Sequence, residues 1–196
     1  ILIFAALAMS IDVLAGYAGR TSLCHGAIFG ASTYVVLYSA TVAGLPLIPA
    51  IVLGVVAATL LAALFAVLAV RTSGVYFLLL TLALGLIVWG VCLRWTAVTG
   101  GENGLRGQLQ AGALADPRRL YLMVLACVAV LAFAMWRFVS SPFGLTLRGI
   151  KDSESRMRSL GYNVPLHLVI AFTASGFFAG VAGALSPSRI VAGSTG

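Results

Sequence analysis

Few residues in this chain could carry out chemistry, and their spacing assembles no catalytic site. The two histidines, His25 and His167, lie far apart, and no serine or cysteine accompanies either in a nucleophile arrangement. A lone histidine is not a metal site. We therefore predict no catalytic residues and no bound metal. The three cysteines have no metal-ligand spacing and are interpreted as small buried apolar residues: Cys24, Cys92 and Cys127.

A glycine-containing segment at residues 19–30 could be confused with a phosphate-binding loop. It reads GRTSLCHGAIFG and lacks the Gly-Lys-Ser/Thr of such loops, and the only lysine of the chain is Lys151. We expect no ATP binding by this chain. Two compatible interpretations remain, a broken helix that lines a solute path and close helix packing through small residues. The residues assigned to the solute path and broken helix, in this segment and just before it, are Asp12, Gly16, Gly19, Ser22, His25, Gly26 and Gly30.

The composition places most of the chain in lipid. Hydrophobic residues make up 61% of the sequence and charged residues 9%, whereas a soluble domain has about a quarter charged residues. So few polar residues cannot cover a core in water, but lipid can serve as the outer solvent. The net charge of +7 comes from basic residues in short gaps between apolar runs. This pattern suits membrane orientation and contact with lipid, and it predicts no nucleic-acid partner.

The apolar runs predict an all-α, polytopic membrane protein with about six transmembrane helices. Each run is near the roughly 20 residues that a helix needs to cross a bilayer, and none alternates as a membrane strand would. Residues 1–196 are expected to form a single transmembrane domain that is incomplete at one or both ends. The predicted spans are Ile1–Ala18, Gly26–Ala43 (or a half-helix re-entering from one side), Leu47–Val70, Val75–Leu93, Arg119–Phe138 and Val164–Leu185.

One carboxylate, Asp12, lies inside the first predicted span. Carboxylates at membrane depth are costly and usually functional. We expect Asp12 to face the helix bundle, either protonated or hydrogen-bonded to a neighbouring helix. Proton coupling through Asp12 is the alternative.

The densest cluster of charge lies at residues 140–163, SSPFGLTLRGIKDSESRMRSLGYN, between two apolar runs. Its lysine and arginine content places it on the cytoplasmic side. The pattern predicts one amphipathic helix from Pro142 to Gly161, with i,i+4 pairs Arg148–Asp152–Arg156 and Glu154–Arg158 on its outside. Glu154 falls on the apolar stripe and therefore needs a partner. The helix could lie on the membrane surface or dock into a groove on another protein.

Four stretches of the sequence resemble one known family. They are SPFGLTLRGIKDSESRMRSLGYNV, the following AFTASGFFAGVAGAL, and, upstream, LAGYAGRTSLCHGAIFGASTY and TLALGLIVWGVCLRWTAVTGGENGL. In this order they are similar to the permease subunits of branched-chain amino acid ABC transporters, in the bacterial cytoplasmic membrane. Related permeases that take up urea or short-chain amides share the pattern. An ion-coupled secondary transporter or channel that uses Asp12 is the alternative from another class.

The resemblance implies a role for residues 140–163. They resemble the coupling loop of ABC importers, which docks on a cytoplasmic ATPase subunit. The segment from Glu154 to Gly161 is similar to the "EAA" pattern of that loop, with Ser155 and Arg156 in place of its two alanines. The residues that this resemblance assigns to coupling are Arg148, Asp152, Glu154, Met157 and Gly161.

The resemblance also implies partners. A second related permease subunit would share the solute path, and the ATPase subunits would hold ATP and Mg, so this chain is expected to need no cofactor. The stretch TGGENGL resembles an outer loop that could meet an extracytoplasmic solute-binding protein, although a plain solvated turn is the alternative. Its candidate residues are Gly100, Gly101, Glu102, Asn103 and Gly104.

Overall fold

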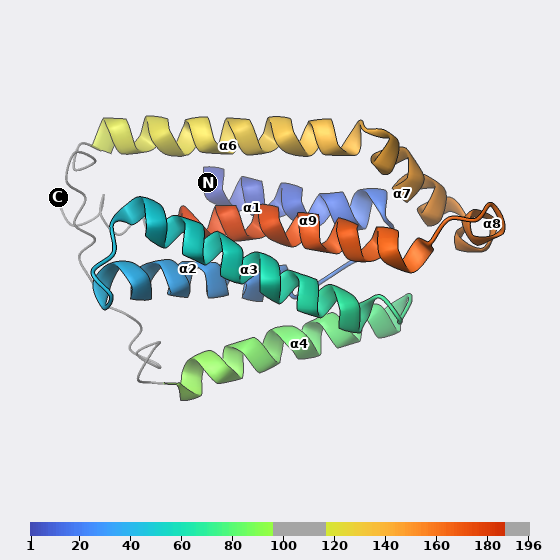
Figure 1. The fold of residues 1–196 in the computed structure, drawn as a ribbon, viewed down its shortest axis with the longest axis horizontal. Helices are drawn as coiled ribbons and strands as arrows, with labels where there is room; N and C mark the ends of the chain where they lie inside the picture. The colour runs from blue at the N-terminus through green and yellow to red at the C-terminus, as the bar shows by residue number, and fades with distance from the viewer. Residues whose placement is uncertain (96–116, 187–196) are drawn as a thin grey trace.

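The computed structural model describes residues 1–95 and 117–186, and these residues form helices and connecting turns without strands (Figure 1). The all-α prediction is confirmed for this part of the chain. The elements are α1 (Leu2–Asp12), the π-helix η1 (Val13–Tyr17), α2 (His25–Thr41), α3 (Leu47–Ala69), α4 (Val75–Arg94), α6 (Pro117–Val139), α7 (Pro142–Asp152), α8 (Glu154–Ser159) and α9 (Val164–Ala184).

Four helices are long and apolar enough to cross a membrane: α3, α4, α9 and the Tyr121–Val139 part of α6. They correspond to four of the predicted spans. The other two predicted spans form shorter helices. The first is the 11-residue α1, which η1 continues for 5 residues, and the second is the 17-residue α2.

The helices run alongside one another, and the chain reverses direction from each to the next (Figure 1). α9 is the central helix, because half of its most apolar stretch is buried inside the molecule and it packs against α1, α2 and α3. α4 and α6 lie on the outer sides. The reversals place residues 18–24, the α3–α4 turn and the α7–α8 segment at one end of the molecule, as alternating spans require.

The single helix predicted from Pro142 to Gly161 is in fact two helices, α7 and α8. Ser153 between them has an extended backbone (φ −161°, ψ 99°), and its hydroxyl accepts a hydrogen bond from the backbone N–H of Arg156. A serine side chain that caps the backbone in this way competes with a continuous helix. Gly161 ends the second helix as predicted, with a left-handed φ of 87° that favours glycine.

Small residues allow α9 to approach its neighbours closely. A Cβ on Gly176 would lie 2.2 Å from Cβ of Ala62 on α3, and a Cβ on Gly180 would lie 2.6 Å from that of Ala58. Ser32 and Thr33 on α2 donate hydrogen bonds to carbonyls of α9. Close packing and interhelical hydrogen bonds hold helices together where lipid gives no hydrophobic driving force between them.

We predict that Gly176→Ala lowers the free energy of unfolding by about 1–3 kcal/mol, because the new methyl group overpacks the α3–α9 contact. Chemical denaturation in mixed micelles measures this. The matched control is Gly90→Ala on α4, where a Cβ meets no atom within 4 Å and alanine is the better helix former. Equal stability of the two variants would contradict this packing.

Candidate functional site

The first region that holds predicted site residues is the break between η1 and α2. The π-helix η1 ends at Tyr17, and Gly19 turns the chain with a left-handed φ of 68°. The chain then runs without regular structure to Cys24 before α2 begins at His25. The backbone N–H of Leu23 donates to the hydroxyl of Thr81 on α4 at 3.2 Å. A non-helical connection of residues 18–24 therefore separates η1 from α2, and a broken helix along a solute path stays a prediction.

His25 is fully buried at the start of α2 and joins three other parts of the chain. Its Nε2 is hydrogen-bonded to Ser175 on α9 at 2.7 Å, and its Nδ1 to Ser22 in the break at 3.1 Å. Ser175 in turn donates to the carbonyl of Ser10 on α1. His25 therefore ties α1, the break, α2 and α9 together.

The hydrogen bonds of this cluster can be assigned a direction. The single hydroxyl proton of Ser175 goes to the Ser10 carbonyl, so Ser175 can only accept from His25. A neutral imidazole then carries its proton on Nε2, and Nδ1 accepts from the hydroxyl of Ser22. The thiol of Cys24, 3.2 Å from the Ser22 oxygen, supplies the remaining donor. Every buried group in the cluster thus has a partner.

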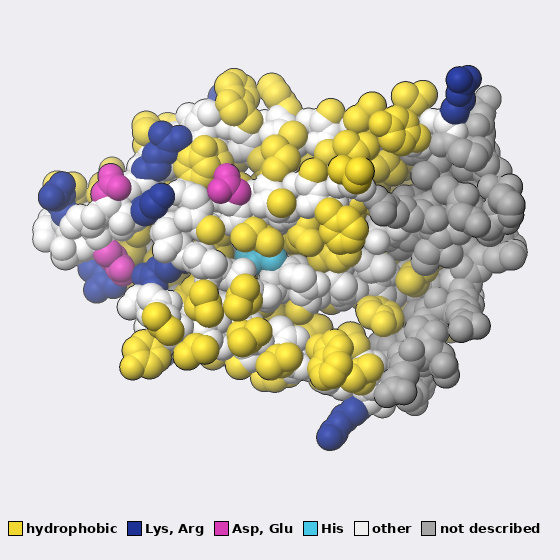
Figure 2. Space-filling model, turned by 180° about the vertical axis from the view of Figure 1, so that it is seen from behind, with side chains coloured by type: hydrophobic (Ala, Val, Ile, Leu, Met, Phe, Trp, Pro, Cys, Tyr) yellow, Lys and Arg dark blue, Asp and Glu magenta, His cyan; other side chains and the backbone are white. Residues whose placement is uncertain are grey.

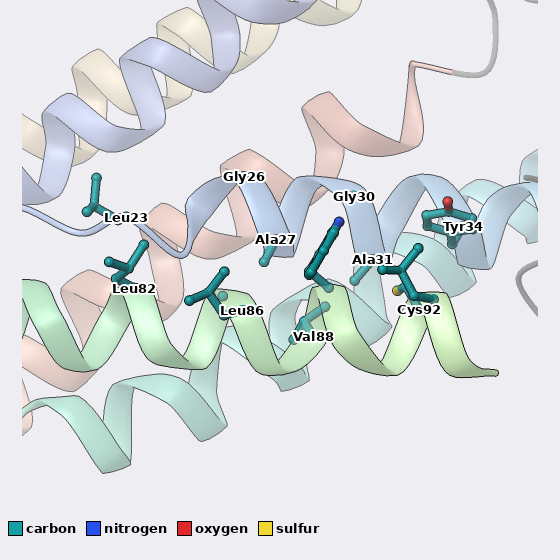
Figure 3. A pocket seen from close by; sticks show the side chains of 13 residues that line it. Leu23, Gly26, Ala27, Gly30, Ala31, Tyr34, Leu82, Leu86, Val88 and Cys92 are labelled. Atoms are coloured by element: carbon teal, nitrogen blue, oxygen red, sulfur yellow. The ribbon is translucent and has the colours of Figure 1, made fainter. Parts of the chain in front are cut away.

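A cavity of about 350 Å³ opens between α2 and α4 (Figure 3). The α2 side has small residues and the α4 side has larger apolar ones. A Cβ added at Gly26 or Gly30 would meet no atom within 4 Å. Within this chain, these two glycines therefore line open space and do not pack against a helix. The lining residues are Leu23, Gly26, Ala27, Gly30, Ala31, Tyr34, Leu82, Gly85, Leu86, Val88, Trp89, Cys92 and Leu93.

Asp12 does not face the bundle as predicted. Its side chain is exposed on the surface of this chain, at the junction of α1 and η1. A Cβ on Gly16 would lie 2.7 Å from the Asp12 carboxylate, so Gly16 leaves room for that carboxylate beside η1. The helical register turns Asp12 outward, which the position of the residue in an apolar run could not reveal.

The second region is the α7–α8 element, where charged side chains gather at one end of the molecule (Figure 2). Glu154 has the partners that its position on the apolar stripe required. One carboxylate oxygen accepts from Arg158 at 2.7 Å, as predicted, and the other from Arg20 at 3.0 Å. Arg148 does not pair with Asp152. Its guanidinium lies over the ring of Tyr17, 4.8 Å from the centroid, while Asp152 is exposed.

The change of direction at Ser153, between α7 and α8, alters which apolar residues of this element point outward. Leu147 and Ile150 are buried. Met157 is half-buried with its sulfur against Gly149, where a Cβ would lie 2.9 Å from it. Leu160, predicted on the same face, is 67% exposed. Its outward position follows from the change of direction between α7 and α8.

Two basic residues of this region, Arg20 and Lys151, make contacts that were not predicted from the sequence. Arg20 is almost fully buried, donates to the carbonyl of Thr72 at 2.6 Å and lies 5.7 Å from the centroid of the Phe77 ring. Lys151 donates to the carbonyl of Gly16 at 2.8 Å. One signal for Arg20 was present, because it is the only lysine or arginine among residues 1–70. The outer-loop candidates, residues 100–104, lie outside the described residues.

The fold and these two regions define a class, an all-helical protein with four helices able to span a membrane, an apolar cavity between α2 and α4, and a charged element at one end. The model of the family "Branched-chain amino acid transport system / permease component" matches residues 1–195. The chain therefore belongs to this permease family, and the resemblance seen in the sequence is confirmed.

Two curated relatives are similar to the chain. They are the high-affinity branched-chain amino acid transport system permease proteins LivM of Salmonella typhimurium, 26% identical over 215 residues, and of Escherichia coli K12, 26% identical over 216 residues. Each alignment covers 96% of this chain and 51% of the relative, so the chain spans about half the length of these relatives. No solved structure matches the chain.

We predict that His25→Ala destabilises the fold by about 2–3 kcal/mol, because it removes two buried hydrogen bonds, to Ser22 and Ser175, and opens a cavity. Denaturation in mixed micelles measures the loss. His167→Ala is the control, since His167 is only partly buried at the start of α9 and bonds the carbonyl of Asn163. It should cost about 1 kcal/mol or less. A loss for His25→Ala no larger than the control's would refute the linking role of His25.

Proposed function

We propose that this chain is part of the transmembrane permease subunit of an ABC importer for branched-chain amino acids. The family match over residues 1–195 carries the proposal, and the role of both curated relatives, high-affinity branched-chain amino acid transport, supports its substrate class. The subunit lies in the bacterial cytoplasmic membrane. It crosses the membrane six times within this chain, with α1–η1 and α2 as the two shorter spans.

The α7–α8 element faces the cytoplasm in this proposal. The end of the molecule that carries it also carries Arg20 and Arg71 in the two earlier turns. Basic residues in short connections mark the cytoplasmic side of a membrane protein. There α7 and α8 contact a partner ATPase, which holds ATP and Mg, while this chain itself needs no cofactor. The exposed side chains of Leu145 and Leu160 supply an apolar contact for that partner.

The cavity between α2 and α4 is the part of this chain that takes part in the solute path. Its volume of about 350 Å³ and its largely apolar lining suit an aliphatic side chain. Gly26 and Gly30 allow a solute to approach the backbone of α2, and the non-helical segment before α2 borders the cavity through Leu23. Alternating access would change the separation of α2 and α4.

Exposed Asp12 supports a second permease subunit beside α1. A carboxylate at this depth is costly against lipid, and within this chain it is exposed. A neighbouring protein surface or a water-filled path between two subunits removes that cost. A solute-binding protein would deliver the solute at the opposite end of the molecule.

We predict that Gly30→Leu lowers leucine uptake at least about tenfold, because the new side chain fills the cavity without a clash inside the chain. The complete complex in proteoliposomes, loaded with ATP, provides the measurement. Gly90→Leu is the matched control, since it adds the same side chain to α4 in open space outside this cavity. Normal uptake by Gly30→Leu would exclude the cavity from the path.

Competition for uptake tests the solute class. Excess unlabelled isoleucine and valine should suppress uptake of labelled leucine, and urea or acetamide should not, because the lining offers apolar surface and few polar groups. The same vesicles without ATP should accumulate no leucine. Suppression by urea would assign the subunit to the amide-transporting relatives. Uptake driven by a proton gradient alone would point to the ion-coupled class.

A further inference from the structure

The α7–α8 element contacts the end of η1 and the break that follows it through a row of three charged side chains. Arg148 lies over the ring of Tyr17, Lys151 donates to the carbonyl of Gly16, and Glu154 pairs with Arg20. The three are spaced three residues apart across the α7–α8 junction. Their partners all lie between residues 16 and 20, so one short segment receives all three contacts.

The contact between Glu154 and Arg20 differs from the other two because the Arg20 side chain is buried. That side chain is 10% exposed, whereas that of Arg158, the other partner of Glu154, is 61% exposed. The carbonyl of Thr72 and the ring of Phe77 fix the Arg20 guanidinium against the α3–α4 turn. An ion pair shielded from water interacts more strongly than an exposed one, which water and salt screen.

We propose that Arg20 is a positioning residue that transmits movement of the α7–α8 element to the start of α2, and thereby to the cavity wall. This inference rests on the proposed function, in which a partner ATPase moves that element. Between Arg20 and the first residue of α2 lie only residues 21–24. That segment includes Leu23, which lines the cavity and is fixed to α4 through Thr81. A displacement of Arg20 therefore acts directly on the cavity edge.

The covalent connection from α8 into α9 is the competing route. α9 is packed against α3 through Gly176 and Gly180 with no room for even a methyl group, so it resists a separate movement. The segment before α2, residues 18–24, forms no helix or strand. A few residues in a connecting segment can absorb a change of backbone angles that a packed helix cannot. When the α7–α8 element moves, the segment before α2 is therefore expected to follow it more readily than α9 does.

The test uses the complete transporter in proteoliposomes and measures leucine taken up per ATP hydrolysed. Arg20→Gln, Glu154→Gln and the double variant remove the buried pair. We expect each to lower this ratio about fivefold or more while ATP hydrolysis continues. The double variant should lose no more than either single variant, because one shared interaction is removed. Arg158→Gln, which removes only the exposed partner of Glu154, should keep the ratio within about twofold of the unaltered protein.

A purely structural role of Arg20 would reduce the amount of folded complex and leave the ratio of the surviving complex unchanged. Arg20→Gln could fail to fold, so two milder variants accompany it. Glu154→Gln alters a less buried side chain, and Arg20→Lys keeps the charge. Arg20→Lys should retain part of the coupling. An unchanged ratio in Glu154→Gln, or additive losses in the double variant, would overturn the proposal. If the unaltered complex shows no ATP-dependent uptake, the proposed function fails, and the role of Arg20 in coupling fails with it.

Discussion

The need to satisfy backbone and side-chain polar groups away from water governs this structure. The irregular segment before α2 leaves backbone N–H and C=O groups that apolar surroundings cannot bind. Here Thr81 accepts from Leu23, and the side chains of Ser22, His25 and Ser175 bond one another and the carbonyl of Ser10. These bonds come from four different elements. The break can therefore exist only when α1, α2, α4 and α9 are assembled around it.

Glycine has two opposite uses in this bundle. On α9, Gly176 and Gly180 bring the backbone into contact with α3, which makes the central helices a rigid unit. On α2, Gly26 and Gly30 face open space and create a cavity. The cavity itself lies between α2 and α4, and Leu23 of the segment before α2 lines its edge. The two uses together suit a path that opens and closes.

Charged side chains of α7 and α8 form contacts within this chain, whatever contact they make with a partner. Glu154, which the resemblance to a coupling loop assigns to a partner, is bonded to Arg20 and Arg158 of its own chain. The surface left for a partner is formed by exposed side chains such as Leu145 and Leu160. Under the proposed function, contact with a partner and internal transmission are separate tasks, carried by different residues of one short element.

The sequence by itself determined the helical class, four of the long helices, the break near residue 19, the turn at Gly161 and the Glu154–Arg158 pair, because these depend on apolar run length, local backbone preference and i,i+4 spacing. Only the tertiary structure decided the rest. The direction of Asp12, the open space at Gly26 and Gly30, and the Arg20–Glu154 pair depend on which helix faces which. Residues 20 and 154 are 134 positions apart, and no local pattern encodes that contact, since packing of whole helices brings the two side chains together.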